Sequence, residues 1–152
     1  MLGSEAVAGG VGIDVVDIGR LKAFVARRGE DVIDRLLSDV ERIAVRGKRG
    51  VVWSAFAGRV AAKEATKKLL GSRGEMARWS QIEVCHGLHG EPYIRLTGET
   101  LMAAHRQGIN GLLLSISHEK DIAIAIVVGT STWQPWETTW IPTTLSSRSC
   151  VS

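Results

Sequence analysis

The sequence predicts one α+β domain, in which a mostly antiparallel sheet packs on a long helix. Short apolar segments with strand-like spacing recur along the chain, and two longer segments repeat apolar residues at helical spacing. Their order, β-α-α-α-β-β-α-β-β, places several strands in direct succession, which favours antiparallel pairing. The 152 residues fit a single domain better than two.

The first elements are a lead-in, a strand and an interrupted helix. Residues 1–10 are small and Gly-rich and are expected to be a flexible lead-in. A short strand follows, marked by Val11, Ile13, Val15 and Val16. Apolar positions then recur at helical spacing over 18–37, and Gly29 is expected to interrupt that helix.

Capping residues delimit the next two helices. Ser38 followed by Glu41 is a capping-box pattern, so a short helix is predicted to begin near residue 39. The segment RGKRG at 46–50 is a basic, Gly-punctuated loop. The clearest helix spans about 52–70, is rich in alanine, and is expected to end at Gly71 as its C-terminal cap.

The second half of the chain is expected to contribute most of the strands. Segments 81–85 and 92–96 are predicted to form an antiparallel hairpin, and 112–117 and 122–128 flank a polar turn. Between these pairs, 99–108 is predicted to be a short helix. The domain is therefore assigned to 11–129, and the Trp-, Ser- and Thr-rich segment 130–152 is expected to be a disordered tail.

Composition excludes several classes of protein. Hydrophobic residues make up 45% and charged residues 23%, which excludes a disordered chain, a collagen-like fibre and a disulfide-rich miniprotein. The net charge of +3 favours an anionic partner but is too small to imply nucleic acid. Cys85 and Cys150 match no metal spacing and are expected to be reduced thiols. Without a membrane-length apolar run or a signal-peptide pattern, the protein is expected to be cytoplasmic.

Three segments place polar groups in otherwise apolar elements. Asp14 lies inside the first strand, where a carboxylate needs a partner or could instead cap the following helix. On the long helix, Glu64 and Lys68 have the spacing of a surface ion pair, and Arg59 and Lys63 could be a solvated face. His118 at a strand end is either a site residue or an ordinary turn histidine.

The residue types in these segments are those of a metal site that binds phosphate. Two carboxylates from separate segments make a minimal site for Mg²⁺ against phosphate oxygens. Neighbouring Arg and Lys side chains would then hold phosphates. A phosphate-handling metal site is therefore one of the interpretations that these segments leave open.

At these segments the chain resembles the holo-acyl-carrier-protein synthase family, the short phosphopantetheinyl transferases. The first family motif, G-[IL]-D followed by Arg, is matched by Gly12, Ile13, Asp14 and Arg20. The helical motif is matched at Phe56, Arg59, Ala61, Ala62, Lys63, Glu64, Ala65, Lys68 and Gly71, and the strand motif S-[IV]-[ST]-H at 115–118. A hairpin motif is matched by Gly90, Pro92, Leu96 and Gly98. The resemblance covers about 11–129 in the family's order and spacing.

The resemblance implies a reaction and a site. The reaction is transfer of 4′-phosphopantetheine from coenzyme A to a serine of an apo acyl carrier protein, releasing adenosine 3′,5′-bisphosphate. Asp14 and Glu64 would hold Mg²⁺ on the diphosphate, and Lys68 would contact the diphosphate. Arg59 and His118 would face the adenosine 3′-phosphate, and Gly71 completes the cofactor-binding set. Glu64 and a metal-bound water are both candidates for the base, with Glu64 and Lys68 as the catalytic pair.

The resemblance also implies partners. The acidic carrier is expected to dock on the first helix, where Arg20, Arg27 and Arg28 lie near one face, although a solubilising basic face would also place them there. Members of the family form homotrimers with sites between protomers, which is expected here too.

The alternative function is a non-catalytic carrier-binding module with the same fold. A nucleic-acid-binding domain is disfavoured because the basic loop has only Trp53 nearby.

Overall fold

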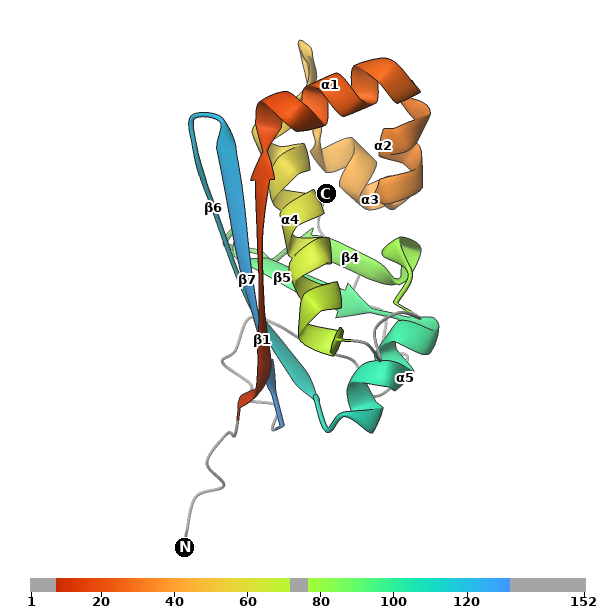
Figure 1. The fold of residues 1–152 in the computed structure, drawn as a ribbon, viewed down its shortest axis with the longest axis vertical. Coiled ribbons are helices and arrows are strands. Elements are labelled where there is room, and N and C mark those ends of the chain that lie inside the picture. The colour runs from red at the N-terminus through yellow and green to blue at the C-terminus, as the bar shows by residue number, and fades with distance from the viewer. Residues whose placement is uncertain (1–7, 72–76, 132–152) are drawn as a thin grey trace, which may run out of the picture.

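Three antiparallel strands form the main sheet of the protein. The computed structural model describes residues 8–71 and 77–131 of the chain (Figure 1). The strands are β1 (Ala8–Asp17), β6 (Gly111–Glu119) and β7 (Ile122–Thr130), in the order β1-β7-β6. β1 begins three residues before the expected start at residue 11, because β7 extends to Thr130 and pairs with it there. Of the predicted lead-in, 8–10 therefore belong to the sheet, and 1–7 lie outside the described residues.

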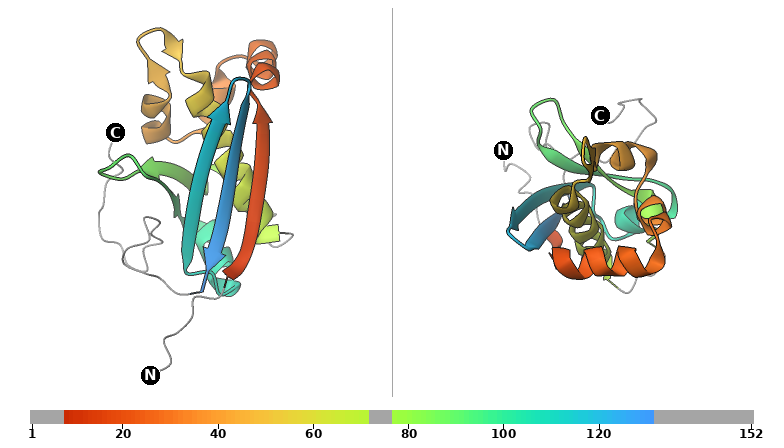
Figure 2. Two further views of the ribbon diagram at one scale, coloured as in Figure 1. Left: turned by 90° about the vertical axis from the view of Figure 1, so that its left-hand side faces the viewer. Right: turned by 90° about the horizontal axis from the view of Figure 1, so that it is seen from above.

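The long helix α4 (Trp53–Leu70) packs against one face of this sheet (Figures 1 and 2). The contact with β1 is close because Gly12 has no side chain. A Cβ atom at Gly12 would lie 1.9 Å from the backbone oxygen of Ala65. Small residues on both elements thus allow the β1 backbone to approach the helix, and this contact positions the next inward-facing residue of β1, Asp14.

Three short helices and a small hairpin cover one end of α4 (Figure 1). They are α1 (Ile18–Arg28), α2 (Asp31–Leu36), α3 (Asp39–Ala44), β2 (Arg46–Gly47) and β3 (Gly50–Val51). The predicted interruption at Gly29 is confirmed, since Gly29 ends α1 with φ 89°. The capping box of Ser38 and Glu41 is also confirmed. The segment 46–50, predicted as a loop, contains instead the paired strands β2 and β3.

The predicted hairpin and the last helix cover α4 on the side away from the sheet and at its far end (Figure 1). The elements are η2 (Trp79–Gln81), β4 (Ile82–His86), β5 (Pro92–Leu96) and α5 (Gly98–Arg106). β4 and β5 pair antiparallel, as predicted. Their buried residues, including Val84 and Ile94, share one core with the alanines of α4 and with β7.

The opposite face of the main sheet carries exposed apolar side chains. Val11, Ile13 and Val15 of β1 are 65%, 52% and 56% exposed, and none of the described elements covers this face (Figure 2). Their pairing partners in β7 include Ile126 opposite Ile13. We call the set Val11, Ile13, Val15, Ile122, Ile124 and Ile126 the outer apolar face.

Cys85 is not a free thiol, so the expectation of a reduced thiol there is wrong, while Cys150 lies outside the described residues. Of the predicted tail, 132–152 also lie outside the described residues, whereas Thr130 belongs to β7. Among the described helices, none combines the length and the apolar character that a membrane span requires.

Candidate active site

Asp14 points from β1 toward α4 and contacts Lys68 there. Side chains alternate along a strand, so Asp14 shares the inward face with Gly12. The Oδ1 atom of Asp14 accepts a hydrogen bond from Nζ of Lys68 at 2.7 Å, and the Asp14 side chain is only 16% exposed. The helix-capping alternative for Asp14 is excluded, because Asp17 caps α1 by accepting from the backbone N–H of Arg20.

Glu64 lies one helical turn before Lys68 on the same helix. Its Oε1 atom is 3.5 Å from Nζ of Lys67, so the surface pair expected between Glu64 and Lys68 is replaced by a pair with Lys67. The Lys67 ammonium also lies 5.4 Å from the ring centre of Trp79. Asp14, Glu64, Lys67 and Lys68 therefore form a small group of alternating charge, which we call the β1–α4 charge cluster.

Arg59 is a buried residue, so the interpretation of Arg59 and Lys63 as a solvated face is wrong. The guanidinium of Arg59 donates from Nη1 to the backbone oxygen of Ala55 at 3.1 Å, and Nη2 lies 3.4 Å from Nδ1 of His86. Among the described residues its Nε atom has no acceptor although it is buried. Burial lowers the pKa of Arg59, and the charge of Glu41 opposes this shift in part.

His86 at the end of β4 was not predicted as a functional residue. Because Arg59 can only donate, Nδ1 of His86 must accept, which places the proton of a neutral imidazole on Nε2. Burial, together with the positive charge of Arg59, lowers the pKa of His86, while Glu91 raises it. No sequence motif marks this contact, since it joins residues from α4 and β4 through the tertiary fold.

The structure does not join every predicted site residue to the β1–α4 charge cluster. His118 is exposed on β6, opposite Ala123, near the β6–β7 turn. Within the described chain, neither His118 nor Arg59 makes a hydrogen bond or ion pair to Asp14, Glu64 or Lys68.

Gly71 ends α4 directly after the helical turn that carries Lys67 and Lys68. It has φ 60°, which favours glycine, and its N–H donates to the backbone oxygens of Lys67 and Lys68. The predicted C-terminal cap is therefore confirmed. The cap fixes the last turn of α4, from which both lysines extend.

A buried ion pair behind the site was also missed by the sequence analysis. Nζ of Lys63 lies 2.7 Å from Oε2 of Glu41, and neither side chain is exposed. Lys63 also donates to the backbone oxygen of Trp79, and Oε1 of Glu41 accepts from the backbone N–H of Val84. The pair fixes α3, η2 and β4 to the turn of α4 that carries Glu64.

The carboxylates of this site are the kind of ligand that a divalent cation such as Mg²⁺ binds. In the part of the chain that is described, no three His, Cys, Asp or Glu residues gather as a complete metal site. Mg²⁺ does not need one, because it commonly uses one or two carboxylates together with substrate phosphates and water. Asp14 and Glu64 offer carboxylate oxygens on neighbouring elements, and Asp14 already holds a cationic group, so the chemistry of these residues fits such an ion.

Known proteins were compared with the chain. The family model of the 4′-phosphopantetheinyl transferase superfamily matches residues 10–127. A holo-[acyl-carrier-protein] synthase of Desulforudis audaxviator is 40% identical over 124 residues, which cover 80% of this chain and 94% of that protein. A second relative with that name, from Beutenbergia cavernae, is 42% identical over 119 residues, covering 78% of this chain and 95% of the relative.

Solved structures agree with these matches. Holo-[acyl-carrier-protein] synthase of Helicobacter pylori, solved in complex with coenzyme A, is 32% identical with a TM-score of 0.67, covering 78% of this chain and 98% of that one. The holo-ACP-synthase of Plasmodium yoelii has a TM-score of 0.74 at 24% identity, covering 85% and 99%, and shows the shared fold. The chain therefore belongs to the 4′-phosphopantetheinyl transferase superfamily.

Proposed function

We propose that the protein is a holo-acyl-carrier-protein synthase, which transfers 4′-phosphopantetheine from coenzyme A to a serine of an apo acyl carrier protein. The named relatives, and the coenzyme A complex of the Helicobacter pylori protein, support this assignment. One observation carries the proposal for this chain. Asp14 of β1 contacts Lys68 of α4, one helical turn from Glu64, and this contact supports the assignment of these residues to metal and diphosphate.

In the proposed reaction the serine oxygen attacks the β-phosphorus of coenzyme A. The bond to the departing adenosine 3′,5′-bisphosphate breaks, and the serine proton passes to a base, for which Glu64 is this chain's candidate. Lys68 would hold the diphosphate, as a compact positive charge beside the phosphate oxygens. Asp14 and Glu64 would hold Mg²⁺, which would neutralise the diphosphate and stabilise the leaving group.

Arg59, His118 and Gly71 are proposed to bind the nucleotide part of coenzyme A. The buried Nε atom of Arg59 lacks an acceptor among the described residues, and a phosphate oxygen is the kind of acceptor that a guanidinium prefers. His118 is exposed and free to contact an anion. Gly71 presents backbone beside the two lysines without a side chain that would obstruct a ligand.

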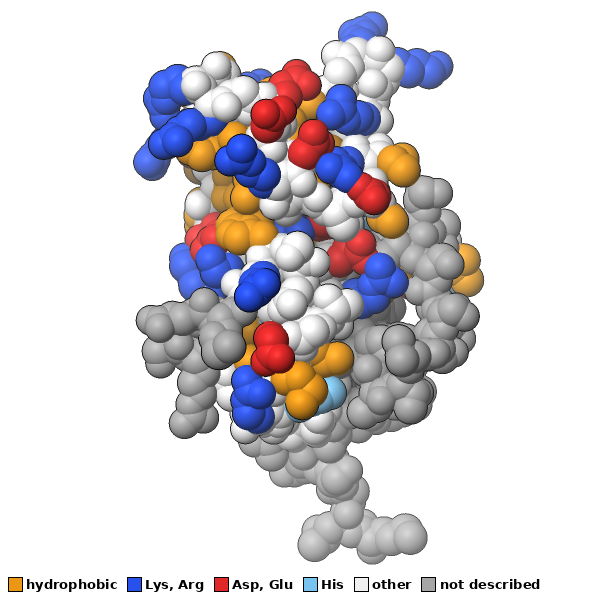
Figure 3. Space-filling view, turned by 90° about the vertical axis from the view of Figure 1, so that its right-hand side faces the viewer, with side chains coloured by type: hydrophobic (Ala, Val, Ile, Leu, Met, Phe, Trp, Pro, Cys, Tyr) orange, Lys and Arg blue, Asp and Glu red, His pale blue; other side chains and the backbone are white. Residues whose placement is uncertain are grey.

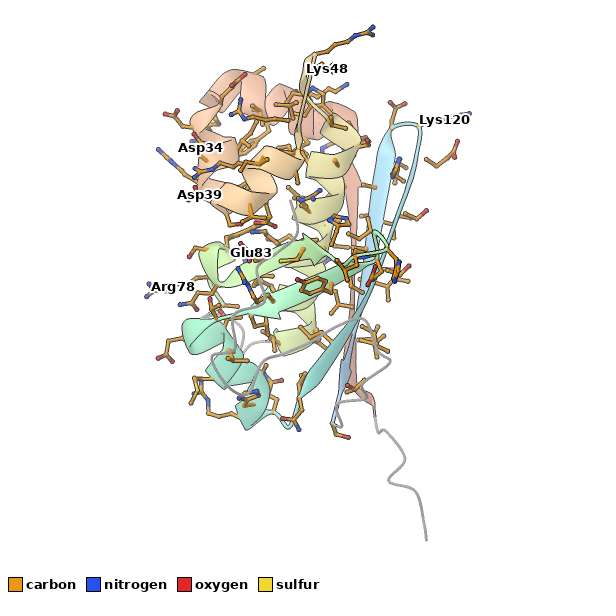
Figure 4. All side chains as sticks on the ribbon, turned by 180° about the vertical axis from the view of Figure 1, so that it is seen from behind. Asp34, Asp39, Lys48, Arg78, Glu83 and Lys120 are labelled. Carbon is orange, nitrogen blue, oxygen red and sulfur yellow. The ribbon has the colours of Figure 1, made fainter. Side chains whose placement is uncertain are left out.

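The carrier protein is proposed to dock on α1. Arg20, Arg27 and Arg28 are exposed there, and Figure 3 shows Lys and Arg side chains, interspersed with Asp and Glu, over the end of the molecule built by α1–α3. Carrier proteins are typically acidic, so the charges of the two surfaces are complementary. The same end carries Lys48 at the tip of the β2–β3 hairpin and Lys120 at the β6–β7 turn (Figure 4).

The active form is proposed to be a homotrimer in the cytoplasm, with each site between two protomers. The outer apolar face supports association, because soluble monomers rarely expose a contiguous apolar surface of this kind. Exposed Ile and Val side chains on a sheet that no described element covers would be buried by another copy.

The proposal is tested by intact-mass spectrometry of an apo carrier protein after incubation with this chain, coenzyme A and Mg²⁺. A mass gain of one phosphopantetheine group is expected, and a carrier whose acceptor serine is replaced by alanine should gain none. A folded chain that binds the carrier but leaves its mass unchanged would support the non-catalytic carrier-binding module instead.

A further inference from the structure

The two carboxylates proposed to hold Mg²⁺ are both paired with lysines of the same helix. Nζ of Lys68 lies 2.7 Å from Oδ1 of Asp14, and Nζ of Lys67 lies 3.5 Å from Oε1 of Glu64. The first contact joins residues 54 apart in sequence, so it is made by the tertiary fold rather than by helical spacing. An ammonium group therefore lies against the carboxylate where a divalent cation would bind.

We propose that Lys68 is a resident counter-ion, which occupies the cation position at Asp14 until a divalent cation and an anionic substrate arrive together. This inference rests on the proposed function, because that function supplies the divalent cation and the diphosphate. Lys68 then has two partners in turn, first the carboxylate of Asp14 and afterwards the diphosphate of coenzyme A.

The charges of the β1–α4 charge cluster explain why a divalent cation displaces Lys68 from Asp14 only together with an anion. Two lysines balance two carboxylates in the β1–α4 charge cluster, so a divalent cation alone would leave the cluster doubly positive. Repulsion between the cation and the displaced ammonium opposes binding of the metal by itself. A diphosphate compensates this charge and offers the ammonium of Lys68 new acceptors, so metal and substrate each favour binding of the other.

The structure also gives Lys68 the freedom to move. Its side chain is 54% exposed, whereas that of Asp14 is 16% exposed. The carboxylate is thus held at the contact between sheet and helix, and the flexible four-carbon chain of the lysine can move toward solvent. Lys67 is more constrained, because its ammonium also lies 5.4 Å from the ring centre of Trp79.

The inference is tested by titrating Mn²⁺, followed by electron paramagnetic resonance of the free ion, into the full chain without coenzyme A. Mn²⁺ takes the same oxygen ligands as Mg²⁺. Replacement of Lys68 by methionine should tighten Mn²⁺ binding about three- to fivefold, the range expected for losing one exposed competing ion pair. Lys68→Arg should bind Mn²⁺ as weakly as the wild type, because a guanidinium can still pair with Asp14.

Two further substitutions distinguish competition by Lys68 from a general effect of charge on Mn²⁺ binding. Lys48→Met removes one positive charge from the tip of the β2–β3 hairpin and should leave Mn²⁺ affinity unchanged (Figure 4). Asp14→Asn should weaken Mn²⁺ binding in both the wild-type and the Lys68→Met backgrounds. Thermal unfolding of each variant shows that it is folded.

The failures of the two proposals are distinguishable. If Lys68→Met binds Mn²⁺ no more tightly than the wild type while the wild type modifies the carrier, the counter-ion inference is wrong and the transferase stands. If the carrier is never modified but Lys68→Met binds Mn²⁺ more tightly, Lys68 competes with the cation at Asp14, but the transfer of Lys68 to the diphosphate of coenzyme A is overturned together with the transferase. Equal tightening by Lys48→Met and Lys68→Met would also overturn the inference, because a general charge effect would then explain both.

Discussion

Nζ of Lys63 lies 2.7 Å from Oε2 of Glu41, and both side chains are completely buried. Replacement of Lys63 by methionine leaves the carboxylate of Glu41 buried without its cation. The expected loss is about 3–5 kcal/mol of unfolding free energy, the usual cost of breaking a buried ion pair on one side. Urea denaturation monitored by circular dichroism measures it.

A second substitution tests whether the unpaired carboxylate of Glu41 causes this loss of stability. Lys63→Met combined with Glu41→Gln removes the unpaired buried charge, so the double variant should be more stable than Lys63→Met alone. Lys48→Met, on an exposed turn, should change the free energy of unfolding by less than about 0.5 kcal/mol. A Lys63→Met variant that is as stable as Lys48→Met would show that the buried pair contributes nothing to stability.

Gly12→Ala should separate β1 from α4. The added Cβ would lie 1.9 Å from the backbone oxygen of Ala65, and neither backbone can yield without moving its element. We expect a loss of about 1–3 kcal/mol of unfolding free energy, as for overpacked cores, together with a lower transferase rate because Asp14 is two residues away. Gly19→Ala, at an exposed position of α1, is the control: its Cβ would lie 3.2 Å from Oδ1 of Asp17, a side-chain atom that can shift, so a much smaller loss of stability is expected. Equal stability of the two variants would contradict the close packing described here.

The sequence predicted local features well because neighbouring residues determine them. Ser38 and Glu41 are three residues apart, and their capping box depends only on the backbone of one helical turn. The further roles of Glu41 could not be predicted in this way. Its carboxylate binds Lys63 and the N–H of Val84, the latter 43 residues away, and only the packing of α3 against α4 and β4 brings these groups together.

The candidate site likewise combines features that the sequence predicts with contacts that only the tertiary fold creates. The motifs identified Asp14, Glu64 and Lys68, but helical spacing alone favoured a pair between Glu64 and Lys68, whereas Lys68 contacts Asp14 across the β1–α4 interface. Strand alternation places Asp14 and Ile13 on opposite faces without showing which face packs on the helix. The more apolar residues of β1 point outward, which hydrophobicity within one chain would not predict.

Acid should destabilise the fold through His86. Its pKa is lowered in the folded protein, by burial and by the charge of Arg59, so the unfolded chain binds a proton more readily. Stability therefore decreases as the pH falls through the unfolded-state value of about 6.5 toward the lower folded-state pKa. His86→Gln should show a smaller decrease in melting temperature between pH 7.5 and pH 5.5 than the wild type. The control His89→Gln, in the exposed turn of the same hairpin, should show the same decrease as the wild type, and identical decreases in all three proteins would contradict this role.

A charge on the outer apolar face should dissociate the proposed trimer. Ile13→Glu places a carboxylate where the side chain is 52% exposed in one protomer and would be buried between copies. Sedimentation velocity should report a trimer for the wild type and a monomer for this variant. Ile43→Glu, at a position of 63% exposure on α3, should leave the trimer intact. A wild type that sediments as a monomer would refute the assembly.

Reversal of charge on α1 should weaken binding of the carrier rather than catalysis. Arg27→Glu replaces attraction to an acidic carrier by repulsion, so we expect KM for the carrier to rise about tenfold with kcat nearly unchanged. High salt should reduce the difference from the wild type, because exposed charges are screened. Arg106→Glu, exposed on α5 at the other end of the molecule, is the control. An unchanged KM for Arg27→Glu would show that the carrier docks elsewhere.

The central claim is that the carboxylates of the β1–α4 charge cluster support metal-dependent phosphopantetheine transfer. The most direct measurement is the initial rate of carrier modification, followed by intact mass, for the wild type with Mg²⁺, the wild type with EDTA, and Glu64→Gln with Mg²⁺. We predict rapid addition of one phosphopantetheine group in the first sample and loss of nearly all activity in the other two. A rate that survives both EDTA and the loss of the Glu64 carboxylate would contradict the account.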